Sequence, residues 1–195
     1  MVPFVGLTGG MGAGKSTALE ALERLGAEVL STDAVVHELY AGEELRDAVV
    51  ERWGPEVAPG GVVDRSAIAA HAFARGEDRA WLEELLWPRV GARTLAWLEQ
   101  ARARRPPPRA AVVEIPLLFE AGMEGLYDAT IAVISAEEIR RERAAGRGHV
   151  LMEERAARQL SQEEKAQRAT FAVSNDGTEE ELQRELSAIL DKLGE

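Results

Sequence analysis

The stretch MVPFVGLTGGMGAGKSTALEALERLGAEVLSTD, residues 1–33, decides the fold. An apolar run over residues 2–8 has the composition of a buried strand, and the glycines of residues 9–14 cannot continue a strand or a stable helix. From Lys15 the apolar residues follow helical spacing as far as Gly26, and a second short apolar run covers residues 27–32. Strand, glycine loop, helix and strand within about thirty residues form a βαβ unit, which predicts a parallel sheet with right-handed crossovers.

The glycine loop (residues 9–16) matches the pattern G-x-x-x-x-G-K-[ST]. Glycines allow successive backbone N–H groups to turn inward around a phosphate, and the helix that starts at Lys15 directs its positive dipole end at the same anion. The Lys15 ammonium can reach the β- and γ-phosphates, and the Ser16 hydroxyl can bind Mg²⁺. We therefore predict an ATP-type nucleotide site whose contacts are Gly9, Gly10, Gly12, Ala13, Gly14, Lys15, Ser16 and Thr17.

After the βαβ unit, the pattern changes from strands to helices and back. Residues 34–105 show mostly helical spacing, and a Gly-Pro-rich piece at residues 54–61 breaks it. Apolar, β-branched runs then predict three further strands, at residues 110–115, 129–134 and 170–174. Together these features predict an α/β fold with a parallel five-stranded sheet. Its core is formed by residues 1–33 and 109–195, with a mostly helical insertion at residues 34–108.

Some local patterns predict helix starts and packing. Asp64 stands where it would cap a helix, and capping boxes are expected at Ser161 with Glu164 and at Thr178 with Glu181. Residues 135–158 are expected to be helical, with an interruption at residues 146–148. The tryptophans are expected to pack the helical insertion, although one of them could instead line an acceptor pocket: Trp53, Trp81, Trp87 and Trp97.

Composition narrows the class of protein. The chain has 195 residues, of which 46% are hydrophobic and 29% charged, so it can bury a core. The absence of cysteine excludes disulfide scaffolds, Cys-zinc sites and Cys nucleophiles. A net charge of −11 has the wrong sign for a protein that coats nucleic acid. No apolar run approaches the ~20 residues of a membrane span, and no secretion signal is evident. We expect a soluble, cytoplasmic protein without nucleic-acid or membrane partners; a monomer is favoured and an oligomer left open.

Two acids stand at the ends of predicted strands and are candidates for the chemistry. Asp33 follows the second strand, next to the loop that ends the first, because parallel strands expose their carboxyl ends on one side of a sheet. It could accept a proton from an attacking hydroxyl or cap the following helix, and spacing favours neither role. Glu114 closes the third strand, where an acid could hold Mg²⁺. A charge that faces solvent is the slightly favoured alternative for Glu114.

Five arginines gather around the interruption of the predicted helix at Gly146 and Gly148: Arg140, Arg141, Arg143, Arg147 and Arg155. Guanidinium groups beside glycines suit a lid, at about residues 140–158, that closes over phosphates and neutralises developing charge. Its catalytic candidates are Arg140, Arg143 and Arg147, although any single arginine fits a solvated helix better. Asn175 lies in Ser-Asn-Asp-Gly after the last strand and is interpreted as a turn residue first and a nucleotide contact second.

These residues by themselves indicate a P-loop small-molecule kinase that uses ATP and Mg²⁺. A nucleoside monophosphate kinase or a sugar-acid kinase fits the same residues, and so does a nucleotide switch that phosphorylates no metabolite. The lack of an Asn-Lys-x-Asp motif, since Asn175 is followed by Asp176, counts against a GTPase switch.

Along essentially the whole chain, the motifs resemble those of the dephospho-coenzyme A kinases. The resemblance is carried, in order, by GLTGGMGAGKST, the strand that ends in Asp33, Asp64-Arg65, Leu86 and Pro88 in LLWPRV, IPLLFE at residues 115–120, Glu163-Glu164-Lys165 and TFAVSNDGT. The combination of GLTGG…GKST, PLLFE and the terminal N-x-G is far more specific than the glycine loop alone. Three positions depart from common family residues: Ser31 and Glu114 replace Asp, and Trp87 replaces His.

The resemblance implies a reaction and an architecture. It implies transfer of the ATP γ-phosphate to the ribose 3′-hydroxyl of dephospho-coenzyme A, which is the last step of coenzyme A biosynthesis. It also implies a three-layer P-loop NTPase-type core, a helical domain that binds the acceptor, and a short lid that bears arginines. Asp33 matches the catalytic aspartate of the family, and the resemblance therefore makes it the preferred base.

Overall fold

A computed structural model of the chain describes residues 1–145 and 159–195. The chain forms two compact units. The first contains Met1–Ser31 and Trp97–Glu195, and the second contains Thr32–Ala96. The predicted assignment of nucleotide binding and acceptor binding to separate parts of the chain stays a prediction.

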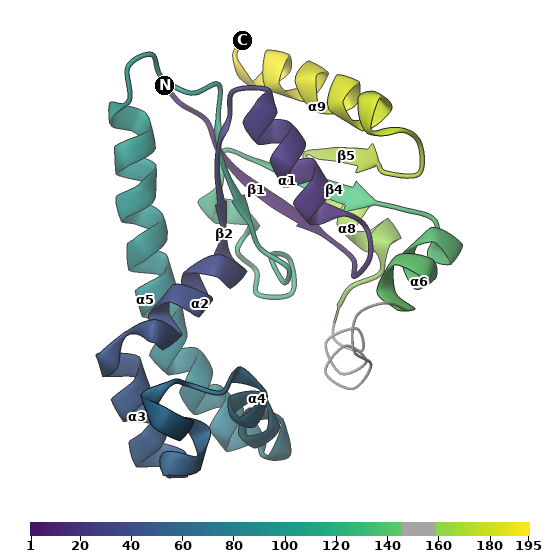
Figure 1. The fold of residues 1–195 in the computed structure, drawn as a ribbon. Helices are drawn as coiled ribbons and strands as arrows, with labels where there is room; N and C mark the ends of the chain where they lie inside the picture. Colours follow the sequence, from purple (N-terminus) through teal and green to yellow (C-terminus); the bar gives the residue numbers. More distant parts are fainter. Residues whose placement is uncertain (146–158) are drawn as a thin grey trace. The chain divides into compact units, whose positions relative to one another are not determined.

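The first unit contains a five-stranded sheet in which all pairings are parallel, as predicted (Figure 1). The strand order is β2-β3-β1-β4-β5. Its strands are β1 (Phe4–Gly9), β2 (Glu28–Ser31), β3 (Ala111–Glu114), β4 (Ala129–Ile134) and β5 (Phe171–Ser174).

Strand β3 lies between β1 and β2, so the two strands of the predicted βαβ unit are not neighbours. In the register of these strands, Leu7 and Ser31 both pair with Glu114. The expectation that the end of β2 lies directly beside the end of β1 is therefore wrong. Since all three strands are parallel, their carboxyl ends still share one edge of the sheet, with Glu114 between the other two.

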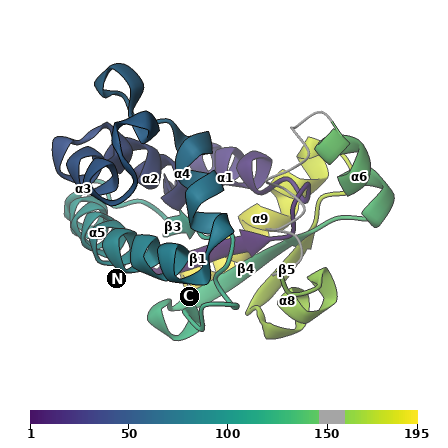
Figure 2. The same cartoon turned by 90° about the horizontal axis from the view of Figure 1, so that it is seen from below.

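The sheet is covered on both faces, because alternate residues of each strand point to opposite sides. Val5, Leu7 and Val112 pack with α1 (Lys15–Arg24) and α9 (Glu179–Leu193) on one face. Phe4, Ala111 and Val113 pack on the other face with residues 118–119 and the end of α5 (Gly76–Ala103). Figure 2 shows α9 and α8 (Gln162–Arg168) on opposite sides of β4 and β5. The predicted three-layer arrangement is thus confirmed.

Local sequence signals set the helix boundaries. Both predicted capping boxes are present, at Ser161 for α8 and Thr178 for α9. The Asp64 carboxylate caps α4 (Arg65–Ala74) as predicted: it accepts hydrogen bonds from the backbone N–H groups of Ser66 and Ala67, at 2.8 and 3.2 Å. The short 3₁₀ turn η3 (Glu124–Leu126) precedes β4, and helix α6 (Glu137–Ala145) follows β4. The predicted helix at residues 135–158 thus begins two residues later than expected, and its residues 146–158 lie outside the described part of the chain.

The second unit is helical, and within its residues 32–96, all described, there is no strand. One apolar cluster forms its core, with Leu45, Val49 and Ile68 almost fully buried. Its helices are α2 (Thr32–Ala41), α3 (Glu43–Trp53), α4 (Arg65–Ala74) and the first part of α5, with 3₁₀ turns η1 (Pro55–Val57) and η2 (Pro59–Gly61) between α3 and α4.

Two of the four tryptophans do not pack this insertion. Trp53 and Trp81 do contribute to the core of the second unit. Trp87 is 61% exposed, however, and Trp97 packs against the sheet of the first unit. The expectation for Trp87 is wrong because Trp87 lies on the solvent side of α5, and that for Trp97 is wrong because α5 continues from one unit into the other.

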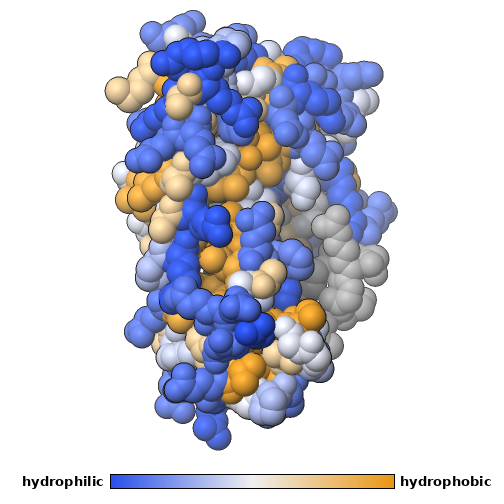
Figure 3. Space-filling model, turned by 60° about the vertical axis from the view of Figure 1, so that its left-hand side comes forward, coloured by the Kyte–Doolittle hydropathy of each residue, from blue (hydrophilic) through white to orange (hydrophobic). Residues whose placement is uncertain are grey.

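Hydrophilic side chains cover much of the face drawn in Figure 3, with hydrophobic groups gathered between them. Among the helices described, not one has the length and apolar character needed to cross a bilayer. The predicted cytoplasmic location stays a prediction.

Candidate active site

The glycine loop turns sharply between β1 and α1. Gly12 and Gly14 have positive φ angles of 75° and 88°, which side chains rarely tolerate. A Cβ on Gly12 would lie 2.6 Å from the carbonyl oxygen of Arg140, and a Cβ on Gly14 would overlap the amide nitrogen of Asn175. Ala13, between the two glycines, is completely buried. Glycine is therefore required at both positions, because neighbouring elements press against the loop backbone.

Lys15 starts α1 as predicted, and its side chain folds back over its own loop. The ammonium Nζ donates hydrogen bonds to the carbonyl oxygens of Gly9 and Gly10, at 3.2 and 3.3 Å. Ser16 is exposed in the same first turn of the helix, and Thr17 is half-buried. This turn contains no acidic residue, so the positive end of the α1 dipole is not offset by its own side chains. A cation and a helix N-terminus therefore meet at one loop, which suits an anion.

Asn175 holds the loop in place from the end of β5. The residue is 6% exposed, and its Nδ2 donates a hydrogen bond to the Ala13 carbonyl oxygen at 2.9 Å. Its backbone N–H donates to Ile134 in β4, also at 2.9 Å. The sequence indicated a turn residue and a nucleotide contact, but it did not reveal this bond. The nucleotide contact stays a prediction.

Two of the predicted lid arginines lie beside the loop. Arg143 donates a hydrogen bond from Nη2 to the carbonyl oxygen of Asn175, at 3.1 Å. A Cβ on Gly10 would lie 2.9 Å from Nη1 of Arg140, so this guanidinium packs closely against the loop. Arg141 instead pairs with Glu137 on the exposed side of α6. Arg147 and Arg155 lie outside the described residues.

A carboxylate adjoins these arginines. The Ser135 hydroxyl near Asp176 and a hydrogen bond from the Ala136 backbone N–H, at 2.7 Å, keep the pKa of its carboxyl below the usual range, and Arg143 adds a smaller effect. Asp176 therefore stays ionised near neutral pH and offsets part of the positive charge that Arg143 brings.

A cavity of about 410 Å³ adjoins the loop. Gly10, Met11 and Arg140 line it, together with residues 135–137 and 159–163. The backbone N–H of Met11 donates to Oε1 of Gln159, at 3.2 Å. Gln162 bonds both the N–H and the C=O of Ser135, at 2.9 and 2.7 Å. Sequence reasoning missed both glutamines, whose only nearby signal was the Ser161 capping box.

The two candidate acids have different surroundings. Glu114 is 8% exposed, so the favoured expectation of a solvent-facing charge is wrong, because β3 has a neighbour strand on each side. Asp33 is exposed on α2. That helix begins at Thr32, so Asp33 lies in its first turn and is not its cap. Asp33 belongs to the second unit, and its catalytic role stays a prediction.

Within residues 1–145 and 159–195, no group of three or more His, Cys, Asp or Glu is placed to hold a metal.

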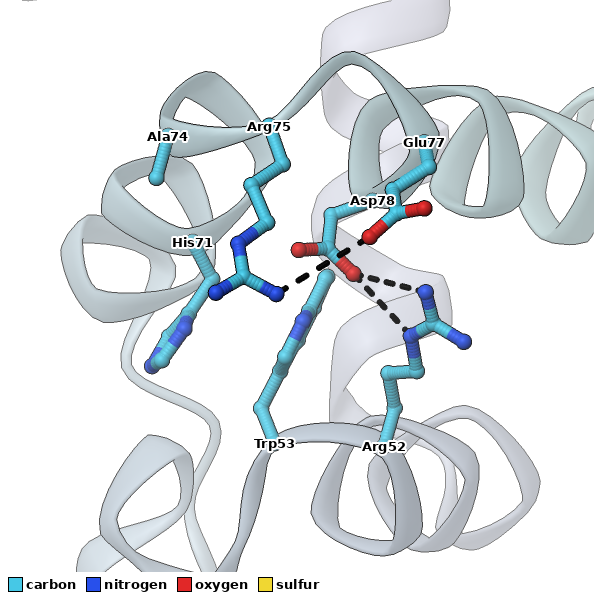
Figure 4. Close-up of a pocket in the computed structure, with 7 residues that line it drawn as sticks. All are labelled: Arg52, Trp53, His71, Ala74, Arg75, Glu77 and Asp78. Carbon is cyan, nitrogen blue, oxygen red and sulfur yellow. Dashed lines mark hydrogen bonds and ion pairs between the residues drawn. The ribbon is translucent and has the colours of Figure 1, made fainter.

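A cavity of about 540 Å³ lies wholly within the second unit (Figure 4). Of the tryptophans considered for an acceptor pocket, Trp53 lines it. Arg52 donates two hydrogen bonds to one oxygen of Asp78, at 2.7 and 3.0 Å. The Trp53 ring stacks on His71, with ring centres 5.4 Å apart, and meets Trp81 edge-on. Arg52 lowers the pKa of Asp78, and burial opposes this shift. The charged and aromatic groups of this cavity are thus engaged with one another.

The chain is similar over most of its length to proteins of one family. Residues 3–181 match the family described as Dephospho-CoA kinase. A Dephospho-CoA kinase of Deinococcus radiodurans is 41% identical over 192 residues, which cover 97% of this chain and 91% of that protein.

Solved structures also match this chain over almost its whole length. A crystal structure of a Thermus thermophilus protein matches with a TM-score of 0.78 and 36% identity, and the match covers 99% of both chains. A Dephospho-CoA kinase from Campylobacter jejuni matches with a TM-score of 0.65 and 22% identity over 98% of this chain and 97% of that one, which shows a shared fold.

Proposed function

Because the chain belongs to the dephospho-CoA kinase family, we propose which of its residues carry the family's reaction. The chain is an ATP-using kinase of coenzyme A biosynthesis, and it phosphorylates the ribose 3′-hydroxyl of dephospho-coenzyme A to give coenzyme A and ADP. The family match decides between this acceptor and the nucleoside monophosphates or sugar acids that the motifs alone left open.

The glycine loop binds the phosphates of ATP. The observation that supports this most is the close packing around Gly12 and Gly14, which fixes the loop backbone before any ligand arrives. Fixed donors stabilise charge better than donors that must first reorganise. Lys15 adds a cation that already lies over the loop, and Ser16 and Thr17 add hydroxyls in the first turn of α1.

Arg140 and Arg143 neutralise charge that develops on the transferred phosphoryl group, and we assign Arg147 to the same task. The support for Arg140 and Arg143 is their contact with the loop and with Asn175, respectively. Phosphoryl transfer depends mainly on positioning and charge stabilisation, so fixed guanidinium groups beside the loop suit it.

Ser16 and Glu114 are assigned to Mg²⁺. An exposed hydroxyl and a buried carboxylate are oxygen donors of the kind that Mg²⁺ takes, and it usually takes only one or two of them from a protein. When bound with ATP, the metal neutralises phosphate charge. Glu114 supports the assignment because it pairs in register with Leu7, two residues before the loop begins.

Asp33 is the base that accepts the proton of the attacking 3′-hydroxyl. Its carboxylate is exposed and makes no hydrogen bond or ion pair with residues 1–145 or 159–195, so it is available to a substrate. Residues 34–108, including the exposed Trp87, are assigned to acceptor binding because the motifs of the chain resemble those of the dephospho-coenzyme A kinases.

The test replaces Asp33 by Asn and measures turnover and ATP affinity separately. We expect turnover with dephospho-coenzyme A to fall by ~10²–10⁴, the usual effect of removing an acid–base group, while the Kd for ATP stays near its original value. Glu185→Gln is the control, since Glu185 is an exposed acid on α9, outside the residues assigned to acceptor binding. Turnover of Asp33→Asn equal to that of the control would remove the base assignment. Assays with AMP and gluconate as acceptors test the substrate assignment independently.

A further inference from the structure

Lys165 is the largest fully buried side chain among the described residues, with 0% of its surface exposed. Its ammonium donates a hydrogen bond to the Pro116 carbonyl oxygen and forms an ion pair with Oε1 of Glu120, both at 2.9 Å. Thr8, also fully buried, donates to the same Pro116 oxygen at 3.3 Å. A charge at this depth is costly unless it is paired, so Lys165 and Glu120 depend on each other.

Glu120 also holds the segment that precedes α8. Its Oε1 accepts a hydrogen bond from the backbone N–H of Leu160, at 2.8 Å. Its Oε2 is buried and makes no hydrogen bond within the part of the chain that the structure describes. The carboxylate is therefore neutralised mainly by Lys165, and its one backbone bond fixes the position of residue 160.

The segment held in this way contacts the glycine loop. Gln159 precedes Leu160 and accepts the N–H of Met11, and Gln162 lies 3.3 Å from where a Cβ on Gly10 would stand. The buried pair thus connects two loop residues to the interior through residues 159–162. At its other end, the shared Pro116 carbonyl connects the pair to Thr8, the residue that immediately precedes the loop.

We propose that Lys165 and Glu120 are positioning residues for phosphoryl transfer: this buried pair sets the placement of Gly10 and Met11 in the loop that receives the ATP phosphates. The proposal rests on the proposed function of the glycine loop. The pair touches no reacting atom and acts through Gln159, Gln162 and Thr8.

The test is the double variant Lys165→Met/Glu120→Gln, which removes both charges and keeps the shapes similar. Removing a whole buried pair is often tolerated, whereas Lys165→Met alone leaves a buried charge and is expected to unfold more easily. For the double variant we expect a Kd for ATP that is about tenfold weaker, the effect of a lost hydrogen bond, with the KM for dephospho-coenzyme A within about twofold. Binding is measured calorimetrically without acceptor, so the result does not depend on Asp33.

A second variant, Gln159→Leu, removes only the bond to the Met11 N–H. We expect it to weaken ATP binding as well, and the effects of the pair and of Gln159 to be less than additive when combined. The matched control is Arg109→Met/Asp191→Asn, an ion pair of the same unit, 2.6 Å long. The other hydrogen bonds of Arg109 go to the carbonyl oxygens of Leu25 and Ser187, outside the loop.

The outcomes separate the two roles. A folded double variant that binds ATP like the control would overturn the proposal and leave the pair a stability element. Fully additive effects with Gln159→Leu would also contradict it. If the double variant does not fold, the ATP affinity of Gln159→Leu alone tests the proposal. An unchanged affinity in that variant would then reject the claim that the pair acts on the loop through Gln159 and Met11. Failure of the loop to bind ATP even in the original chain would instead refute the proposed function.

Discussion

Two regions of this chain gather arginines, acids and aromatic or amide groups around a cavity, and they differ in how those groups are used. In the second unit, Arg52 is bound to Asp78, and the Trp53 ring stacks on His71 and meets Trp81 edge-on. In the first unit, the groups around the glycine loop hold its backbone: Asn175 bonds Ala13, and Gln159 bonds Met11. The contacts in the second unit hold its helices together, whereas the contacts in the first unit hold the backbone of the glycine loop in one conformation.

The difference teaches that cavity size does not identify a binding site. The cavity of the second unit is the larger of the two, about 540 against about 410 Å³. Its charges, however, compensate each other, whereas the loop combines a helix N-terminus, Lys15 and two arginines around glycines that cannot be replaced. A net positive site of fixed geometry is what a polyphosphate requires.

The largest expected effect comes from Lys15→Ala. Removing the ammonium deletes the cation that lies over the loop, so we expect turnover to fall by about 10³-fold and ATP binding to weaken as well. Steady-state kinetics and calorimetry measure the two quantities. Turnover and ATP affinity equal to those of the original enzyme would contradict the comparison. The glycine loop would then have no better claim to bind phosphates than the cavity of the second unit.

A smaller effect is expected for Asn175→Ala, which removes the bond to the Ala13 carbonyl oxygen. A net hydrogen bond contributes about 1 kcal/mol, so ATP should bind about five- to tenfold more weakly. Ser174→Ala is the control, since its exposed hydroxyl donates a hydrogen bond to Asp176 and, among the described residues, to none in the loop. Equal ATP affinities of the two variants would show that the loop keeps its shape without Asn175.

The smallest effect on ATP binding is expected for Asp78→Asn in the second unit, within about twofold of the original affinity. Its effect should instead appear in the pH dependence of stability. The pKa of Asp78 is lowered from 3.8 in the folded chain, so its contribution is complete above that value and is lost as the pH falls through the folded pKa.

Thermal unfolding between neutral pH and about pH 3 checks this. The original chain should lose more stability across that range than Asp78→Asn does. Identical pH profiles would mean that the Arg52–Asp78 pair does not stabilise the fold.

Much of the fold could be predicted from local signals. The glycine loop, the strands and the two capping boxes depend on residues close together in sequence, and all of them are present. The strand order could not be predicted in this way, because the insertion of β3 between β1 and β2 depends on pairing between distant segments. The burial of Glu114 follows from that order, and so it was missed as well.

The supports of the site were the least predictable part. Lys165 has the sequence context of a surface lysine, and nothing near it in sequence indicates Glu120 as its partner, 45 positions earlier. Asn175 was recognised as a turn residue, but the bond to Ala13 joins residues 162 positions apart. Sequence patterns identify groups that carry chemistry, whereas the residues that position those groups are determined by tertiary packing.

The most direct test of the account is an NMR titration of the backbone amides with a non-hydrolysable ATP analogue and Mg²⁺. We predict large shift changes for Gly12, Ala13, Gly14, Lys15 and Ser16, and negligible changes for Trp53, His71 and Asp78. Shifts concentrated at the second group, with the loop amides unmoved, would contradict the claim that the packed glycine loop is where this enzyme holds the phosphates of ATP.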